Sequence, residues 1–360
     1  MIGHAGTRAA HKICDPGTSH QVVSCPPSLL KLDSHSQSPL DLTLPQRYFQ
    51  PMAGQIYNIE MLTYPQLEAF DRQSTFFFIA ASPLEEHGPH LPIGVDMFNA
   101  WFFANQTAEI LVKDYPQYDA VLFPPLPLGT QVYKQLGSFY VKSSTLNDVI
   151  YYTGKGLALY GFTNIFVITA HGTPKQVVAI EKACRKVMRK HKVKMYCLSG
   201  SLIFKFLKGE IYELISKKSG RQFTEEERRI MKYDYHAGWW ETAMMLKFHP
   251  ELVDKSYTLL KPYLKDAASG EVISDNKQWQ GYTGAPAKAD LEFAEASIEV
   301  FADIARNLIH RYIDGQDITS EVRSPFYWVP AFHPRFKKYV AIGLIAIAMA
   351  ILAYLVLRIP

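Results

Sequence analysis

The side chains that could most readily take part in chemistry fall within one short stretch, residues 85–96. This stretch holds Glu85, Glu86, His87, His90 and Asp96. Two glycines and two prolines lie between them and interrupt any helix, so these side chains are expected on a loop. Imidazole and carboxylate groups together bind Zn, Mn or Fe, and a carboxylate can bridge two ions. The stretch therefore predicts a metal site, and the alternative is a polar surface loop with solvated carboxylates.

Two apolar runs place this loop and a further histidine at the edge of a sheet. Residues 76–81 form a continuous apolar run just before the loop, which is typical of a buried strand. His171 follows a second strand-like run, residues 165–169, after Ala170, and precedes Gly172. In open α/β sheets, ligands bind in a crevice outside the carboxyl ends of the strands. We therefore expect His171 in the same crevice, although a histidine at a helix start can also serve as a cap.

A third group of polar residues lies in residues 234–242. His236 and Glu241 are close enough in sequence to face the crevice together from the start of a helix. Asp234 is expected to cap that helix or to support a histidine. Trp239 and Trp240 are expected in the core, where one of them could also form a wall of the substrate pocket.

The pattern E-x-H-G-x-H-L-P-x-x-x-D across residues 85–96 resembles the signature of the creatininase family, which comprises creatinine amidohydrolase-like metal-dependent hydrolases. The resemblance implies two divalent metal ions per subunit, Zn, Mn or Fe. It also implies a catalytic role for Glu241 and makes His236 the proton donor or shuttle. The metal ligands that it implies, with Asp96 as the bridge, are Glu85, His87, Asp96, His171 and Glu241.

The resemblance spans about residues 54–312 but is uneven. Residues 234–242 are similar to the family's D-x-H-A-G-x-x-E-T, with Ala243 in place of the following Ser. The family's N-G-H-G-G-N is reduced to His171 and Gly172. Thr173 stands where creatininase itself has a metal-binding Glu, which argues against creatinine as the substrate.

The order of expected elements predicts the fold. Strands alternate with helices along the chain, which predicts an α/β fold with three α/β/α layers and a mainly parallel sheet covered on both faces. Residues 255–283 are expected to form loops, with short strands as the alternative. The expected strands are 76–82, 120–123, 164–169 and 194–198, and the expected helices are 64–72, 97–113, 145–160, 174–191, parts of 205–233, a segment from about 236, and 288–313.

The two ends of the chain differ from the middle. Residues 1–51 are rich in Ser, Pro, His and Thr and are predicted to be a disordered extension, with Met52 as a hypothetical true start. The catalytic domain is assigned to residues 52–313 and a linker to residues 314–338. Residues 339–357 carry no charged side chain and are long enough to cross a bilayer core of roughly 30 Å.

This apolar segment predicts a single-pass C-terminal transmembrane anchor. Arg335, Lys337 and Lys338 precede it, whereas only Arg358 follows it. The positive-inside rule then places the catalytic domain in the cytoplasm.

Composition limits the other partners. The chain has 360 residues and a formal net charge of +4, without a block of Lys and Arg in its soluble part, so nucleic acid is not an expected partner. The cysteines show no paired spacing and are expected as free thiols in a reducing compartment. They are Cys14, Cys25, Cys184 and Cys197.

These observations lead to one main hypothesis and one alternative. The chain is expected to hydrolyse a non-peptide C–N bond of a small amide, cyclic or formamide-type, through a metal-activated water. The family also implies a homo-oligomer. The alternative is a non-catalytic, membrane-tethered adaptor that keeps the fold, which the altered segment around His171 favours. Retention of all the ligand residues favours the enzyme, because unpaired buried carboxylates are costly.

Overall fold

The computed structural model describes residues 54–264 and 279–357. The predicted disordered extension, residues 1–51, therefore lies outside the described residues, and so do Cys14 and Cys25. Residues 265–278 of the expected loop segment 255–283 lie outside them as well. Cys184 and Cys197 are buried free thiols, as expected.

A six-stranded parallel sheet forms the centre of the fold. Its order is β1-β3-β2-β5-β6, and the short β4 pairs with the end of β2. Every residue of β2 is buried, as expected for a parallel strand covered on both faces. The strands are β1 (Ile56–Asn58), β2 (Thr75–Ser82), β3 (Asp119–Leu122), β4 (Leu126–Pro127), β5 (Asn164–Ile168) and β6 (Lys194–Cys197).

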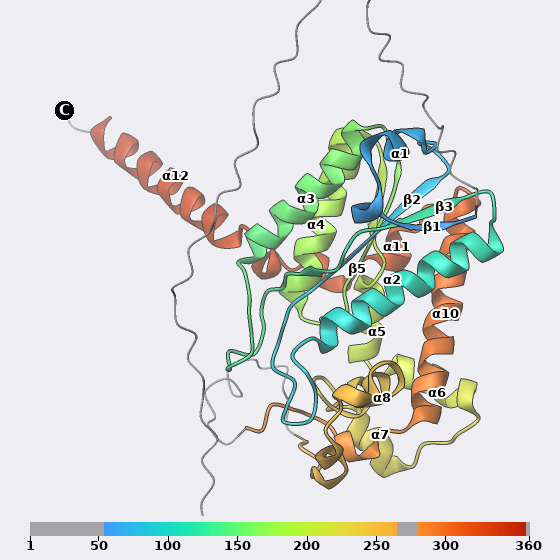
Figure 1. Ribbon diagram of the computed structural model, residues 1–360. Helices are drawn as coiled ribbons and strands as arrows, with labels where there is room; N and C mark the ends of the chain where they lie inside the picture. The colour runs from blue at the N-terminus through green and yellow to red at the C-terminus, as the bar shows by residue number, and fades with distance from the viewer. Residues whose placement is uncertain (1–53, 265–278, 358–360) are drawn as a thin grey trace, which may run out of the picture. The chain divides into compact units, whose positions relative to one another are not determined.

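Helices cover both faces of this sheet (Figure 1). Phe77 faces the side covered by α3 (Ser143–Leu159) and α4 (Pro174–His191), whose apolar residues pack in the same cluster. Phe76 and Phe78 face the other side, covered by α2 (Val95–Asp114) and α10 (Leu291–Ile313). Successive β2 side chains thus enter opposite cores, and the predicted three-layer α/β/α fold is confirmed.

A smaller group of helices extends the core beyond the sheet. Trp239 and Trp240 are both buried in its apolar cluster, together with Phe293 of α10. The helices of this group are α5 (Gly200–Leu207), α6 (Glu210–Ser219), α7 (Glu225–Met231) and α8 (Trp239–Phe248).

The expected elements are present, and the structure adds several short ones. The short strands β1 and β4 and helix α11 (Thr319–Val322) were not expected. Within residues 255–264 the chain forms a 3-10 helix, η3 (Lys255–Leu259), and a single bridge between Tyr263 and Gly284. Further helices before the C-terminal segment are α1 (Tyr64–Ala69), η1 (Ile59–Met61), η2 (Pro250–Leu252) and η5 (Pro286–Lys288).

The segment predicted as a linker makes specific contacts with the sheet-covering helix α4. Its helices η6 (Pro325–Trp328) and η7 (Pro330–Phe332) both contact α4. The backbone N–H and hydroxyl of Ser324 donate to Glu181 on α4, at 2.6 and 3.0 Å. Beyond it, α12 (Phe336–Val356) is apolar and long enough to cross a membrane, and none of its candidate span is buried. The membrane anchor remains a prediction.

Candidate metal centre

The carboxyl ends of β2 and β5 bring two of the predicted loops together. The two strands pair in parallel up to Ala80 and Ile168. Beyond this point, the hydroxyls of Ser82 and Thr169 lie 3.1 Å apart, and the N–H of Ala170 donates to the Ser82 hydroxyl at 3.0 Å. These bonds fix the residue before His171 against the start of the loop that carries Glu85.

The first candidate metal group consists of Glu85, Asp96 and His171, all buried. Nδ1 of His171 lies 3.0 Å from a carboxylate oxygen of each of the two acids. Asp96 lies in the first turn of α2, where unpaired backbone N–H groups favour negative charge. The second oxygen of Glu85 accepts a hydrogen bond from the N–H of Tyr133 at 2.6 Å.

The second candidate group consists of His87, His236 and Glu241. Nε2 of His87 lies 3.6 Å from Glu241 and 3.8 Å from Asp96. Nδ1 of His87 lies 2.9 Å from the backbone carbonyl of Glu85, which can only accept, so Nδ1 carries the hydrogen. Nε2 of His87 is then left with a lone pair directed at the carboxylates, which is the usual orientation of a metal-binding histidine.

Asp96 connects the two groups. One of its oxygens lies 3.0 Å from His171 and the other 3.8 Å from His87. Its carboxylate thus faces both groups at once. This position is the one that a bridging ligand between two ions requires.

Backbone contacts position two members of the second group, His236 and Glu241. Nε2 of His236 lies 2.6 Å from the carbonyl oxygen of Glu86 and therefore donates to it. Ala237 adopts a left-handed backbone conformation, with φ of 46°, and its N–H donates to Glu241. A non-glycine residue in this region is strained, and such strain clusters at functional sites.

The donor set fits a metal. Nε2 of His87 and Nε2 of His171 are buried and have no hydrogen-bond partner among the described residues. Burial of the neighbouring carboxylates of Glu85 and Asp96 without positive charge would be costly. The imidazole nitrogens and carboxylate oxygens gathered here are the ligands that Zn, Mn and Fe accept.

The raised pKa values of His87 and His171 also indicate that the site favours positive charge. Burial lowers the pKa of His87, but the carboxylates of Glu241, Asp96 and Glu85 outweigh it and raise that pKa to about 10. Burial also opposes the charge on His171, yet Glu85 and Asp96 hold its pKa well above the usual value. Burial and the nearby His87 lower the pKa of His236 to about 3, which keeps that ring neutral.

Asp234 supports the site from outside it, as a helix cap. Its carboxylate accepts from the N–H groups of Trp239 and Trp240 at 2.6 and 2.9 Å, and from the hydroxyl of Tyr212 at 2.9 Å. Burial raises the pKa of Asp234 to about 7. The expected capping role is confirmed, and it fixes the start of the helix that carries Glu241.

Two residues of the first loop lie outside both metal groups. Nε2 of His90 lies 2.9 Å from the hydroxyl of Thr242 in α8. The His90 side chain thus connects the first loop to α8. The carboxylate of Glu86 accepts from the N–H of Gly88 at 2.7 Å and folds back on the loop.

Tyr133 contacts the site but was not expected there. Its backbone holds Glu85, and its ring lies 4.6 Å from that of His236 and 4.6 Å from that of Trp279. The sequence around Tyr133 contains no motif that would have revealed this contact.

The fold and the site together define a class of α/β proteins with a candidate metal centre at the carboxyl edge of a parallel sheet. A family model described as "Creatininase: Creatinine amidohydrolase" matches residues 60–309. The chain belongs to the creatininase family, and its fold is that of metal-dependent amidohydrolases.

Solved structures show the same fold. A crystal structure of creatinine amidohydrolase is 19% identical, with a TM-score of 0.55, covering 74% of this chain and 97% of that one. A mutant creatininase complexed with creatine is 19% identical, with a TM-score of 0.53, covering 72% and 98%. A mutant creatininase of Zn-Zn type is 19% identical, with a TM-score of 0.52, covering 74% and 98%. No curated protein sequence matches this chain significantly.

Proposed function

We propose that this protein is a metal-dependent hydrolase that cleaves a non-peptide C–N bond of an amide, cyclic or formamide-type. The observation that supports this most directly is the meeting of two candidate metal groups at the carboxylate of Asp96. Glu85, Asp96 and His171 would hold one divalent ion, and Asp96, His87 and Glu241 the other. Bound ions of this kind lower the pKa of water and stabilise a developing oxyanion.

His236 is proposed as the proton donor to the leaving nitrogen rather than as a ligand. Its hydrogen sits on Nε2, where it is shared with the carbonyl of Glu86, and its ring centre lies 4.2 Å from that of His87. Glu241 would position the second ion and, through its bond from Ala237, the backbone next to His236. Because its ring rests neutral, His236 can accept the proton that the attacking water loses and then pass it to the leaving nitrogen.

The comparisons support zinc or manganese as the ions and a small amide as the substrate. The similar structures include a Zn-Zn creatininase, a manganese creatininase and a complex with creatine. Thr173 stands where creatininase itself has a metal-binding Glu, and it offers no carboxylate to an ion. Its hydroxyl instead donates to the carbonyl of Thr130 at 3.2 Å. Creatinine itself is therefore a poor candidate among the amides.

Membrane attachment through α12 and a homo-oligomeric state are parts of the same proposal. The candidate span of α12 is wholly exposed, and Arg335, Lys337 and Lys338 lie at its start, which supports a cytoplasmic catalytic domain. A non-catalytic tethered adaptor is the second candidate, and the altered segment around His171 favours it.

Hydrolysis of an amide panel by the metal-loaded chain tests the proposal. The panel contains cyclic amides and formamides, and product amine is measured for the wild type, His87→Ala and His310→Ala, an exposed control. We expect turnover of at least one amide, a loss of at least about a hundredfold in His87→Ala, and little change in His310→Ala. Equal activity in His87→Ala, or no turnover by a folded protein that holds its metal, would support the adaptor instead.

A further inference from the structure

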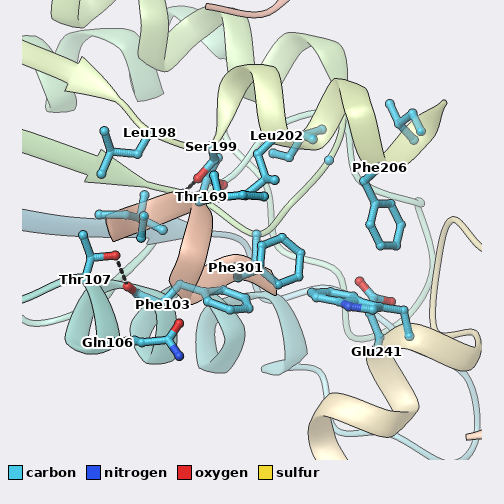
Figure 2. A pocket seen from close by; sticks show the side chains of 18 of the residues that line it. Phe103, Gln106, Thr107, Thr169, Leu198, Ser199, Leu202, Phe206, Glu241 and Phe301 are labelled. Carbon is cyan, nitrogen blue, oxygen red and sulfur yellow. Dashed lines mark hydrogen bonds between the residues drawn. The ribbon is translucent and has the colours of Figure 1, made fainter. Parts of the chain in front are cut away.

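A large apolar cavity adjoins the candidate metal centre. It lies between α2, α5, α8 and α10 and reaches the carboxyl ends of β5 and β6, with a volume of about 1030 Å³ including the space at its mouth (Figure 2). Its walls are formed mainly by aromatic and aliphatic side chains, which include Phe103, Leu202, Phe206, Phe301, Ile304 and Ala305.

The cavity and the metal centre share residues. His236 and Glu241 line the cavity and also belong to the second candidate metal group. Ala170 and Gly172, on either side of His171, contribute to its wall as well. Figure 2 shows Glu241 at one end of the cavity and Leu198 toward the other. A group that extends from a reacting amide into this space would therefore start at the metal centre and continue along apolar walls.

Three polar side chains in the wall are already engaged with the protein. The hydroxyl of Thr107 donates to the carbonyl of Phe103 at 2.6 Å. The hydroxyl of Ser199 accepts from the N–H of Thr169 at 3.0 Å, and the Thr169 hydroxyl pairs with Ser82. A polar substituent would find these groups occupied, whereas an apolar one would lose little by leaving water.

We propose that the substrate is an amide that carries an extended apolar substituent, and that this substituent binds in the cavity while the amide lies at the metal centre. The inference rests on the proposed function and adds the substrate class to it. Each methylene buried in an apolar wall can tighten binding up to about fourfold, which corresponds to about 0.8 kcal/mol.

A series of linear hydroxamates tests the proposal by binding rather than by turnover. The hydroxamate head chelates metal, and the alkyl tail lengthens from one carbon to seven. Affinities are measured by calorimetry on the full-length, metal-loaded chain in lipid nanodiscs, with empty nanodiscs as a blank for partitioning. We expect affinity to rise about two- to fourfold per added methylene in the wild type.

Two variants on the same helix locate the tail. Ala305→Phe fills the cavity, while Asn307→Phe adds the same group to an exposed position of α10. The gain with chain length should disappear in Ala305→Phe and persist in Asn307→Phe. Leu202→Trp on α5 provides a second filled cavity, with the exposed Lys205→Trp as its control, should Ala305→Phe fail to fold.

The outcomes separate this inference from the function on which it rests. If the shortest hydroxamate binds in a metal-dependent way and longer tails add nothing, the apolar-substrate inference is wrong and the metal centre stands. If longer tails bind more tightly in the wild type and equally so in both filled variants, they bind elsewhere and the inference is again wrong. If the folded chain holds no metal, the proposed function fails first and this inference with it.

Discussion

Glu181 on α4 offers a quantitative test of how the C-terminal segment is held against the domain. Its side chain is buried, with the residue 6% exposed, and it accepts both hydrogen bonds from Ser324. A Cβ on Gly200 would lie 2.2 Å from its carboxylate, so the pocket around it is tightly closed. Burial raises the pKa of Glu181 from 4.5 to about 7, although the Ser324 bonds and the charges of Arg323 and Lys182 lower it in part.

The sign of the pH effect follows from this rise. The folded state keeps a proton on Glu181 that the unfolded state releases, so the free energy of unfolding decreases as the pH rises from about 4.5 to 7. At about 1.36 kcal/mol per pKa unit, the decrease reaches about 3 kcal/mol above pH 7. Glu181→Gln keeps the shape of the protonated acid and avoids the buried charge.

Urea denaturation followed by tryptophan fluorescence at two pH values measures the effect. We expect Glu181→Gln to be within about 1 kcal/mol of the wild type at pH 5, and about 3 kcal/mol more stable at pH 8.5. The exposed Glu292→Gln serves as the control and should change little at either pH. A difference that does not depend on pH, or a wild type that is more stable than Glu181→Gln at pH 8.5, would refute the reasoning.

Two further substitutions probe the scaffold of the site. In Gly238→Ala, the new Cβ would lie 1.8 Å from the Asp234 carboxylate, so we expect at least about 3 kcal/mol of destabilisation in thermal denaturation. Gly156→Ala, whose Cβ meets nothing within 4 Å, should be neutral or stabilising, and equal behaviour of the two would contradict this. His90→Ala removes the buried bond to Thr242 and should cost about 1–3 kcal/mol in the same assay with the metal content unchanged. Loss of metal in that variant would instead make His90 part of the centre.

The sequence predicts the parts of this site that are local in the chain. Glu85, His87 and Asp96 lie within one loop and the first turn of the next helix, so their spacing alone brings them together. His171 could be placed because it lies just beyond the end of a buried strand, and parallel strands end at one edge of the sheet. The partner of His90 could not be predicted, since Thr242 lies 152 residues away.

The cavity could not be predicted from the sequence. Phe103, Leu202 and Phe301 come from three helices that are far apart in the chain. In the sequence, each of them resembles an ordinary core residue. The neighbouring residues do not distinguish an apolar side chain that faces a cavity from one that is packed on all sides. The strands β1 and β4, with three and two residues, were missed because such short runs carry no periodic signal.

Metal content tests the central claim most directly. The full-length chain is loaded with zinc or manganese, dialysed and measured by inductively coupled plasma mass spectrometry, beside Asp96→Ala and the exposed Asp303→Ala. A two-ion centre that meets at Asp96 predicts about two equivalents in the wild type and in Asp303→Ala, and a clear loss in Asp96→Ala. A folded wild type that holds no metal, or an Asp96→Ala variant that retains both equivalents, would contradict it.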